Sequence, residues 1–119
     1  MNIEAFREYC LSKKGVSESF PFDEETLVFK VMGKIFALTG LDENPAKANL
    51  KCDPERAIEL RESYPNLIYS GYHMNKKHWN TVRIESNLPH QLVVELIDHS
   101  YDLVVKGLTK KLQAALKEL

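Results

Sequence analysis

Polar and basic side chains gather in the segment GYHMNKKHWN, residues 71–80, which also holds the chain's only tryptophan. Lysine ammonium groups neutralise phosphates, while tyrosine, histidine and asparagine form hydrogen bonds with phosphates and base edges. These residue types together predict a nucleic-acid-binding surface. A lysine at the tip of an expected hairpin and the arginine that follows the segment would extend this surface. The candidate contacts are Lys34, Tyr72, His73, Asn75, Lys76, Lys77, His78, Asn80 and Arg83.

The same segment has a second interpretation, and both stay open. An exposed loop with ordinary solubilising charge would also contain a pair such as Lys76 and Lys77. For Trp79 we expect a place in the core, because burying so large an aromatic side chain stabilises a fold strongly. His78 and Asn80 would then point outward from that strand. With a formal net charge of −1, any DNA binding should be weak and salt-sensitive.

Catalysis finds little support in the residue pattern. Asp98, His99 and Ser100 are consecutive, so on a helix they point in three directions and do not form a nucleophile, base and orienting group. Ser100 is better explained as a small polar residue packed at a helix contact. The chain has no glycine-rich phosphate loop. We therefore expect a protein that is not an enzyme.

Metal ligands also lack a recognised arrangement. His73 and His78 are five residues apart, while Cys52, His90 and His99 are scattered, and none of these spacings is typical of a zinc site. Acidic residues are frequent between positions 15 and 45, but they fall in turns, where solvated carboxylates are routine. We expect neither a metal nor another cofactor.

Length and composition indicate one soluble domain spanning residues 1–119. The 44% hydrophobic and 28% charged fractions are those of a globular protein, and no apolar run is long enough to cross a bilayer. The first ten residues carry three charges and do not resemble a signal peptide. Two cysteines, Cys10 and Cys52, fit reduced thiols. We expect a monomeric, cytoplasmic protein that makes no membrane contact.

Periodicity and turn residues indicate the elements that would position the candidate site. Apolar residues at three- and four-residue spacing predict helices after Asn2, after Asp53-Pro54 and after Pro89, and a terminal helix beyond a break at 107–109. Alternating residues predict a hairpin of Thr26–Val31 and Lys34–Thr39 that turns at Gly33. Further strands are expected at 47–52 and His78–Ile84, with a short apolar run before the latter. Residues 19–26 are expected to be a turn-rich connector.

The resulting order is α-βββ-α-ββ-α, ending in a further short helix. Hairpin connections force antiparallel pairing, so we expect an α+β fold, a two-layer sandwich. It would have a sheet of about five strands and helices packed on one face.

Four blocks of the sequence resemble the YjbR/MmcQ family of small bacterial proteins. They are PFDEETLVFKVMGKIFAL, LKCDPERAIELRESYP, GYHMNKKHWNTV and LIDHSYDLVVKGL, which together run through nearly the whole chain. The resemblance implies a fold similar to the CyaY/frataxin and secretion-chaperone-like proteins. It also implies DNA binding in a double-wing arrangement, in which an exposed hairpin and a neighbouring loop contact the duplex.

A protein-interaction module is the competing class. Secretion-chaperone-like sheets commonly dock partners, and an exposed strand edge would serve for this. So would the apolar stripe of the terminal helix, Leu112, Leu116 and Leu119. Simple packing of that helix against the rest of the fold explains the same stripe.

Overall fold

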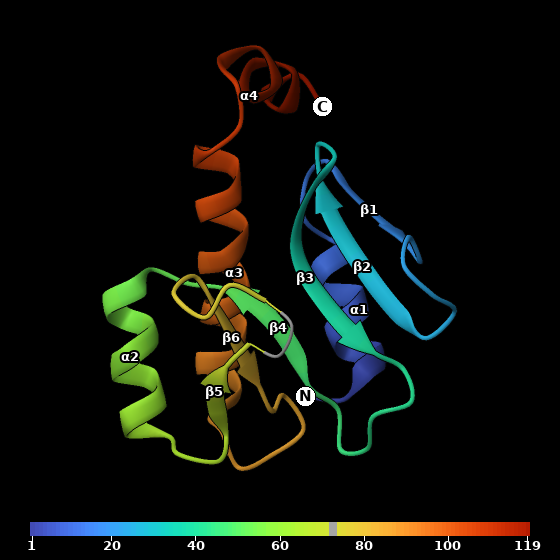
Figure 1. Ribbon diagram of the computed structural model, residues 1–119. Helices are drawn as coiled ribbons and strands as arrows, with labels where there is room; N and C mark the ends of the chain where they lie inside the picture. Colours follow the sequence, from blue (N-terminus) through green and yellow to red (C-terminus); the bar gives the residue numbers. More distant parts are fainter. Residues whose placement is uncertain (72–73) are drawn as a thin grey trace.

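The computed structural model describes residues 1–71 and 74–119 (Figure 1). Its elements in chain order are α1 (Ile3–Leu11), β1 (Val16–Ser19), β2 (Thr26–Val31), β3 (Lys34–Gly40), β4 (Ala48–Lys51), α2 (Pro54–Ser63), β5 (Ile68–Ser70), β6 (Trp79–Val82), α3 (His90–Lys106) and α4 (Lys110–Lys117).

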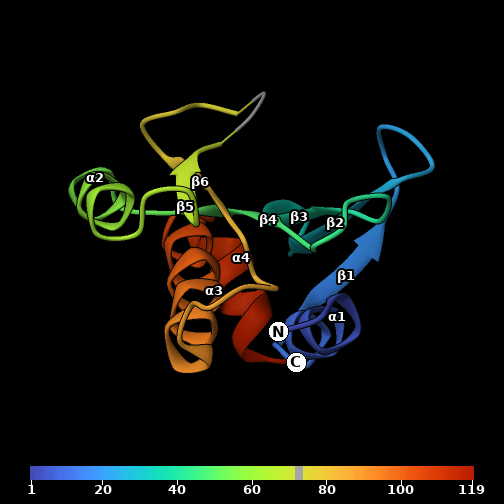
Figure 2. The same cartoon turned by 90° about the horizontal axis from the view of Figure 1, so that it is seen from below.

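The described strands form one antiparallel sheet in the order β1-β2-β3-β4-β6-β5. Helices α1, α3 and α4 lie on one face of this sheet, and α2 lies beside its β5 edge (Figure 2). No helix of the described residues covers the opposite face, which we call the open face; Figure 1 is viewed onto it. The α+β two-layer prediction is confirmed.

One strand, β1, was not predicted. Its four residues, VSES, alternate between partly buried and exposed positions. They have little apolar character, so the sequence pattern does not distinguish them from a connector. The strand exists because it completes the edge of the sheet by pairing with β2, from Val16 opposite Val31 to Ser19 opposite Val28. The connector to β2 therefore begins one residue later than expected, at Phe20.

The predicted helix starts are confirmed, and all but that of α3 have a side-chain cap. The Asn2 side chain accepts a hydrogen bond from the Ala5 amide at 2.8 Å, and Asp53 accepts one from the Glu55 amide at 3.0 Å. Thr109, in the expected break, caps α4 in the same way. At the β2–β3 turn both central residues have positive φ, 49° at Met32 and 86° at Gly33, which is why a glycine is favoured there.

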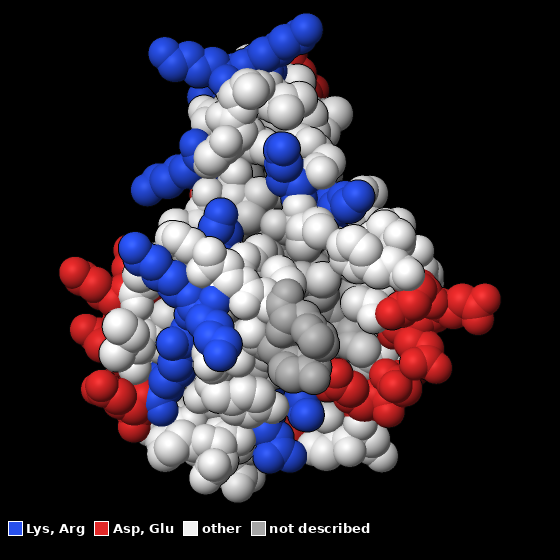
Figure 3. Space-filling view, in the orientation of Figure 1, with Lys and Arg blue, Asp and Glu red and all other residues white. Residues whose placement is uncertain are grey.

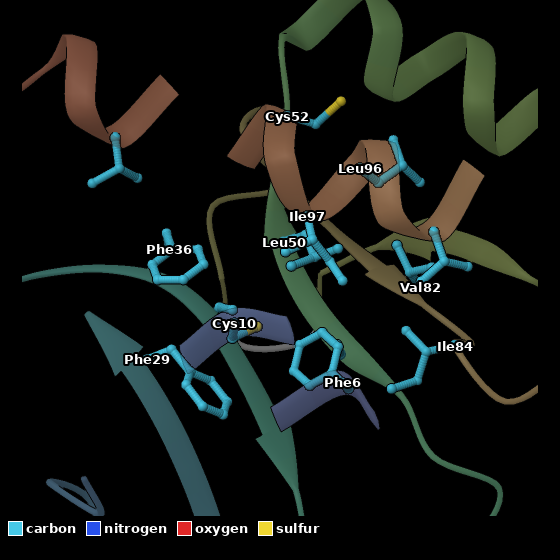
Figure 4. Close-up of a cluster of buried hydrophobic side chains, with 14 of the residues drawn as sticks. Phe6, Cys10, Phe29, Phe36, Leu50, Cys52, Val82, Ile84, Leu96 and Ile97 are labelled. Atoms are coloured by element: carbon cyan, nitrogen blue, oxygen red, sulfur yellow. The ribbon is translucent and has the colours of Figure 1, made fainter. Parts of the chain in front are cut away.

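The hydrophobic core lies between the sheet and the helices on its covered face. Phe6 of α1 meets Phe29 of β2 edge to face, with ring centroids 5.8 Å apart. Phe36 of β3 and Ile97 of α3 are fully buried in the same cluster (Figure 4). Burial of these side chains orients the sheet, and it leaves every second strand residue on the open face.

A buried serine forms hydrogen bonds between α3 and the sheet. Strands β3 and β4 pair only from Ala37 to Leu38, opposite Leu50 and Asn49. At the next position the fully buried Ser100 hydroxyl donates to the Phe36 carbonyl at 2.5 Å and accepts from the Lys51 amide at 2.8 Å. The expectation of a small polar residue at a helix contact is confirmed, because this hydroxyl bridges two backbone groups that no longer reach each other.

Replacing Ser100 by alanine should therefore lower the free energy of unfolding by about 2–4 kcal/mol, because two buried backbone groups lose their partner. Urea denaturation measures this effect. Ser63→Ala, an exposed change at the end of α2, is the matched control and should stay within about 0.5 kcal/mol of the parent. Equal stabilities for the two variants would show that the bridge contributes nothing.

A histidine holds the start of α2 from the side of α3. The Asp53 amide donates to Nε2 of His99 at 3.1 Å, so this nitrogen must be unprotonated. Burial lowers the pKa of His99 below its usual value, and the nearby Arg56 guanidinium lowers it further. The Asp53, Asp102 and Glu95 carboxylates act in the opposite direction, with a smaller effect.

This arrangement predicts a pH dependence of stability. Because the folded-state pKa of His99 is lowered, the unfolded chain binds more protons and protonation favours unfolding. The free energy of unfolding should fall as the pH drops below about 6.5, and this loss should level off once the pH is below the folded-state pKa. Denaturation of the parent and of His99→Gln between about pH 8 and pH 5 checks this. A difference between the two proteins that does not vary with pH would contradict it.

Candidate nucleic-acid interface

Two connections rise from the open face of the sheet, one at each side (Figure 2). The first joins β1 to β2, and the second joins β5 to β6 and contains the candidate segment. Tyr72 and His73, two of the predicted contacts, lie outside the described residues.

Asn75 closes the β5–β6 connection with its own backbone and side chain. Its Oδ1 accepts from the Lys77 amide at 2.9 Å, and its carbonyl accepts from the amides of His78 and Trp79 at 3.2 and 2.9 Å. The resulting tight turn exposes Lys76 and Lys77 together at its tip. The prediction that this lysine pair faces solvent is confirmed.

Arg61 of α2 ties this turn to the body of the protein. Its Nε donates to Asn80 Oδ1 at 2.7 Å, and its Nη2 donates to the Lys76 carbonyl and, at 3.5 Å, to the Trp79 carbonyl. The arginine thus holds the loop by its backbone and leaves the lysine side chains free. Sequence reasoning missed Arg61. Its position four residues after the buried Ala57 places it on the packed side of α2 and was the available signal.

The predicted outward orientation of Asn80 is wrong, and so is its place among the DNA contacts. Asn80 is only 2% exposed. Its amide donates to the Ala57 carbonyl at 3.4 Å while its oxygen accepts from Arg61. Because both ends of the amide have partners on α2, the polar group is accommodated inside the fold.

The core position expected for Trp79 is also wrong. Alternation along β6 places Asn80 and Val82 on the covered side and Trp79 on the open side, where it is only partly buried. Its neighbour in space is Gly71, whose amide donates to the Trp79 carbonyl at 2.9 Å. A side chain at Gly71 would come within about 3.1 Å of the Trp79 Cβ, so the glycine permits this close approach.

Arg83 does not join the lysine pair. It follows the opposite end of β6 from the β5–β6 connection, and its amide donates to the Leu67 carbonyl at 2.8 Å. Four residues of extended strand separate it from Trp79 by roughly 13 Å. Its Nε is buried without a hydrogen-bond partner among the described residues.

Three further lysines lie at the same end of the sheet as Lys76 and Lys77. Antiparallel register brings together the end of β2, the start of β3, the end of β4 and the start of β6. Lys30 and Lys51 lie at open-face positions there, and Lys34 is exposed at the hairpin tip. We call this set the basic end: Lys30, Lys34, Lys51, Lys76 and Lys77. None of its members takes part in the four ion pairs found among the described residues.

Sequence reasoning found Lys34 in the basic end and missed Lys30 and Lys51. Both occupy alternating strand positions, a signal that shows which residues share a face but not which face is open. Figure 3 shows the outcome. Lys and Arg side chains lie over the middle and left of the open face, and others lie at the top over α4 and at the lower edge. Asp and Glu side chains gather at the right, over the β1–β2 and β3–β4 connections, and also along the left edge beside α2.

The described residues contain no group of three or more His, Cys, Asp or Glu side chains placed to hold a metal ion. In the same part of the chain, no helix is long and apolar enough to cross a membrane. Cys10 and Cys52 are buried free thiols, and burial raises their pKa values to about 12 and about 11. They therefore stay protonated near neutral pH and are poor nucleophiles.

Comparison with known proteins agrees with this architecture. The model of the YjbR family matches residues 11–103. The chain belongs to the YjbR family. It is 33% identical to the protein YjbR of Escherichia coli K12 over the full length of both chains. It is also 39% identical over 108 residues to YbdF of Escherichia coli O157:H7, covering 91% of this chain and 88% of the relative.

Solved structures of relatives share the YjbR fold. A crystal structure of a Deinococcus radiodurans protein superposes with a TM-score of 0.91 at 44% identity, covering 98% of this chain and 88% of that one. A Pseudomonas syringae protein gives a TM-score of 0.73 at 30% identity, over 87% and 98% of the two chains. The names of these relatives state no activity, so the function has to be argued from the site.

The role of Arg61 can be tested against a neighbour on the same helix. Arg61→Gln should destabilise the protein by about 1.5–3 kcal/mol and speed hydrogen exchange at the Lys77, His78 and Trp79 amides, because the loop loses its guanidinium anchor. The control, Arg56→Gln, removes a surface pair with Glu95 and should cost less than about 1 kcal/mol. Exchange that rises equally in both variants would contradict the assignment.

Proposed function

We propose that this protein binds double-stranded DNA without chemical change, with the phosphate backbone at the basic end of the sheet. The observation that supports this most strongly is the convergence of its five lysines from β2, β3, β4 and the β5–β6 connection. Residues spread over nearly fifty positions of the chain meet at one end of one face. Such a cluster provides the positive field that attracts a phosphate backbone.

The acidic part of the open face restricts how a duplex would lie. Carboxylates gather over the β1–β2 and β3–β4 connections, away from the β5–β6 connection (Figure 3). Phosphates approaching that region would be repelled, so the contact is confined to the basic end. The tip of the β2–β3 hairpin and the β5–β6 connection then act as the two projecting elements of a double-wing arrangement.

The described candidates offer few groups for reading base edges. Asn75 uses its Oδ1 to accept from the Lys77 amide, and Asn80 is buried against α2. His78 is partly buried, and its carbonyl accepts from the Cys52 amide. Lysines that contact phosphates position a protein on DNA but do not specify a sequence. We therefore propose binding with little sequence preference and strong dependence on salt.

The double variant Lys76→Ala with Lys77→Ala tests this proposal. Fluorescence anisotropy with a labelled DNA duplex at several salt concentrations should show weaker binding and a salt slope reduced by about 2, since each lost phosphate contact removes about 0.9. The fold should be unaffected, because both side chains are exposed and the anchors of the loop are backbone groups.

Lys14→Ala with Lys117→Ala is the matched control. These lysines are exposed, and the Lys14 ammonium group donates to the Lys117 carbonyl near the ends of α1 and α4, in the helical layer. Their removal changes the net charge equally but should leave the salt slope unchanged. The proposal is wrong if both double variants bind DNA alike, or if the parent protein does not bind DNA at low salt.

A further inference from the structure

A groove of about 770 Å³ crosses the open face between the two projecting connections. Its floor is a row of cross-strand neighbours, one from each of four adjacent strands: Leu38 of β3, Asn49 of β4, Thr81 of β6 and Tyr69 of β5. The Thr81 hydroxyl donates to Asn49 Oδ1 at 2.6 Å, which fixes the middle of this row. The floor thus offers both polar and apolar groups. It is rigid because its residues belong to the sheet.

Apolar side chains form parts of the two walls. Phe22 comes from the β1–β2 connection and Met74 from the β5–β6 connection. Phe22 is 65% exposed, the same fraction as the C-terminal Leu119. Phe20 and Leu41, on the β1–β2 and β3–β4 connections, are also 46% and 49% exposed, and the Leu41 amide donates to the Glu25 carbonyl. Several exposed apolar side chains on adjoining connections are typical of a binding surface. Met74 suits such a wall because its side chain adapts to different partners.

Carboxylates line the side of the groove formed by the β1–β2 and β3–β4 connections. Glu25 lies close to Asp42, and the repulsion between these like charges raises the pKa of Glu25 above its usual value. Asp23 accepts from the Glu25 and Thr26 amides, which lowers its pKa and keeps it charged. Among the described residues, neither Glu25 nor Asp42 is paired with a cation, whereas Glu43 lies 3.8 Å from Lys47. Lys47, which also lines the groove, therefore offsets Glu43 alone, and the wall keeps a net negative charge from Asp23, Glu25 and Asp42.

The dimensions of the groove suit an extended segment of polypeptide. Four adjacent strands, spaced about 4.8 Å apart, make a floor roughly 14 Å across, which equals the length of four or five extended residues. The groove lies on the open face of the sheet, between the two projecting connections. Its carboxylates repel the phosphates of a nucleic acid and attract Lys or Arg side chains.

We propose that this groove binds an extended segment of a partner protein that sets a Lys or Arg side chain against Glu25 and Asp42 and an apolar side chain between Phe22 and Met74. The polar floor would hydrogen-bond the backbone of the segment. This site is separate from the basic end, so it does not depend on DNA binding. A partner held here would lie beside a duplex bound at the other end of the same face.

The test is a selection from a random library of displayed peptides about ten residues long, enough to span the floor. Binding to the parent protein is selected, and binding to the variant Glu25→Gln with Asp42→Asn is selected against. Recovered peptides should carry at least one Lys or Arg together with an apolar residue. In an amide NMR titration of the parent protein, they should shift the resonances of Leu38, Asn49, Tyr69 and Thr81.

Fluorescence anisotropy of a recovered peptide then compares matched variants. Affinity should fall about ten-fold or more in Glu25→Gln with Asp42→Asn, because charge-assisted contacts are lost. Glu59→Gln with Glu62→Gln, which neutralises two exposed carboxylates on α2, should leave it unchanged. Phe22→Ser should also weaken binding, which a purely electrostatic attraction would not show. The variant Lys76→Ala with Lys77→Ala should keep its affinity for the peptide and bind DNA more weakly. The peptide site and the DNA site are thus tested independently.

Three outcomes would overturn the proposal. The library could yield no peptide that distinguishes the parent from the groove variant. The peptides could bind equally well after either pair of carboxylates is neutralised. Analytical ultracentrifugation could show that the parent is a dimer which the groove variant converts to monomers, in which case a second copy of the chain occupies the groove.

Discussion

The short ladder between β3 and β4 is the constraint on which the remaining geometry depends. Two residue pairs join these strands. Beyond one end the Ser100 hydroxyl of α3 bridges Phe36 and Lys51, and beyond the other the Thr39 hydroxyl donates to the Lys47 carbonyl at 2.7 Å. The Ser100 bridge replaces a direct backbone bond, and it connects the β1–β2–β3 part of the sheet to the β4–β6–β5 part. Because the two parts are held in one register, Lys34 and Lys51 stay at the same end of the sheet. The composition of the candidate interface therefore depends in part on a buried hydroxyl in the opposite layer.

A second polar link positions the loop that carries the lysine pair. Arg61 donates to Asn80 and to the carbonyls of Lys76 and Trp79, so α2, β6 and the β5–β6 connection form one hydrogen-bonded unit. An anchor of this kind acts on backbone and buried groups, which leaves the exposed side chains available for a ligand. It also explains why an arginine serves here: its planar fork of donors reaches several acceptors at once. Arg61, which positions the loop, thus lies outside the segment 71–80 that carries the lysine pair.

The open face separates two kinds of charge on one rigid surface. Lysines collect where four strand ends meet. Carboxylates collect on the β1–β2 and β3–β4 connections, at the right of Figure 3, while those of α2 lie along its left edge. A net charge of −1 conceals this division, because it sums 16 basic and 17 acidic residues over the whole chain. Fields of opposite sign on one face favour ligands of opposite sign at its two ends. The DNA site and the peptide groove proposed for this YjbR-family protein are the two consequences of that division.

Local signals in the sequence determined the helix starts, the β2–β3 hairpin, the two-layer α+β class and the exposure of Lys76 and Lys77. Each of these rests on short-range physics: side-chain caps, a turn that needs positive φ, and apolar periodicity.

Tertiary structure decided the remaining features. Strand alternation places Trp79 and Asn80 on opposite faces of the sheet but does not say which of them faces the helices. Asn80 takes the covered face because its amide finds hydrogen-bond partners on α2. Strand β1 exists through pairing rather than through its own residues. Register between strands far apart in the chain brings Lys30 and Lys51 to the lysine pair and forms the groove between distant connections. No local sequence pattern encodes this register.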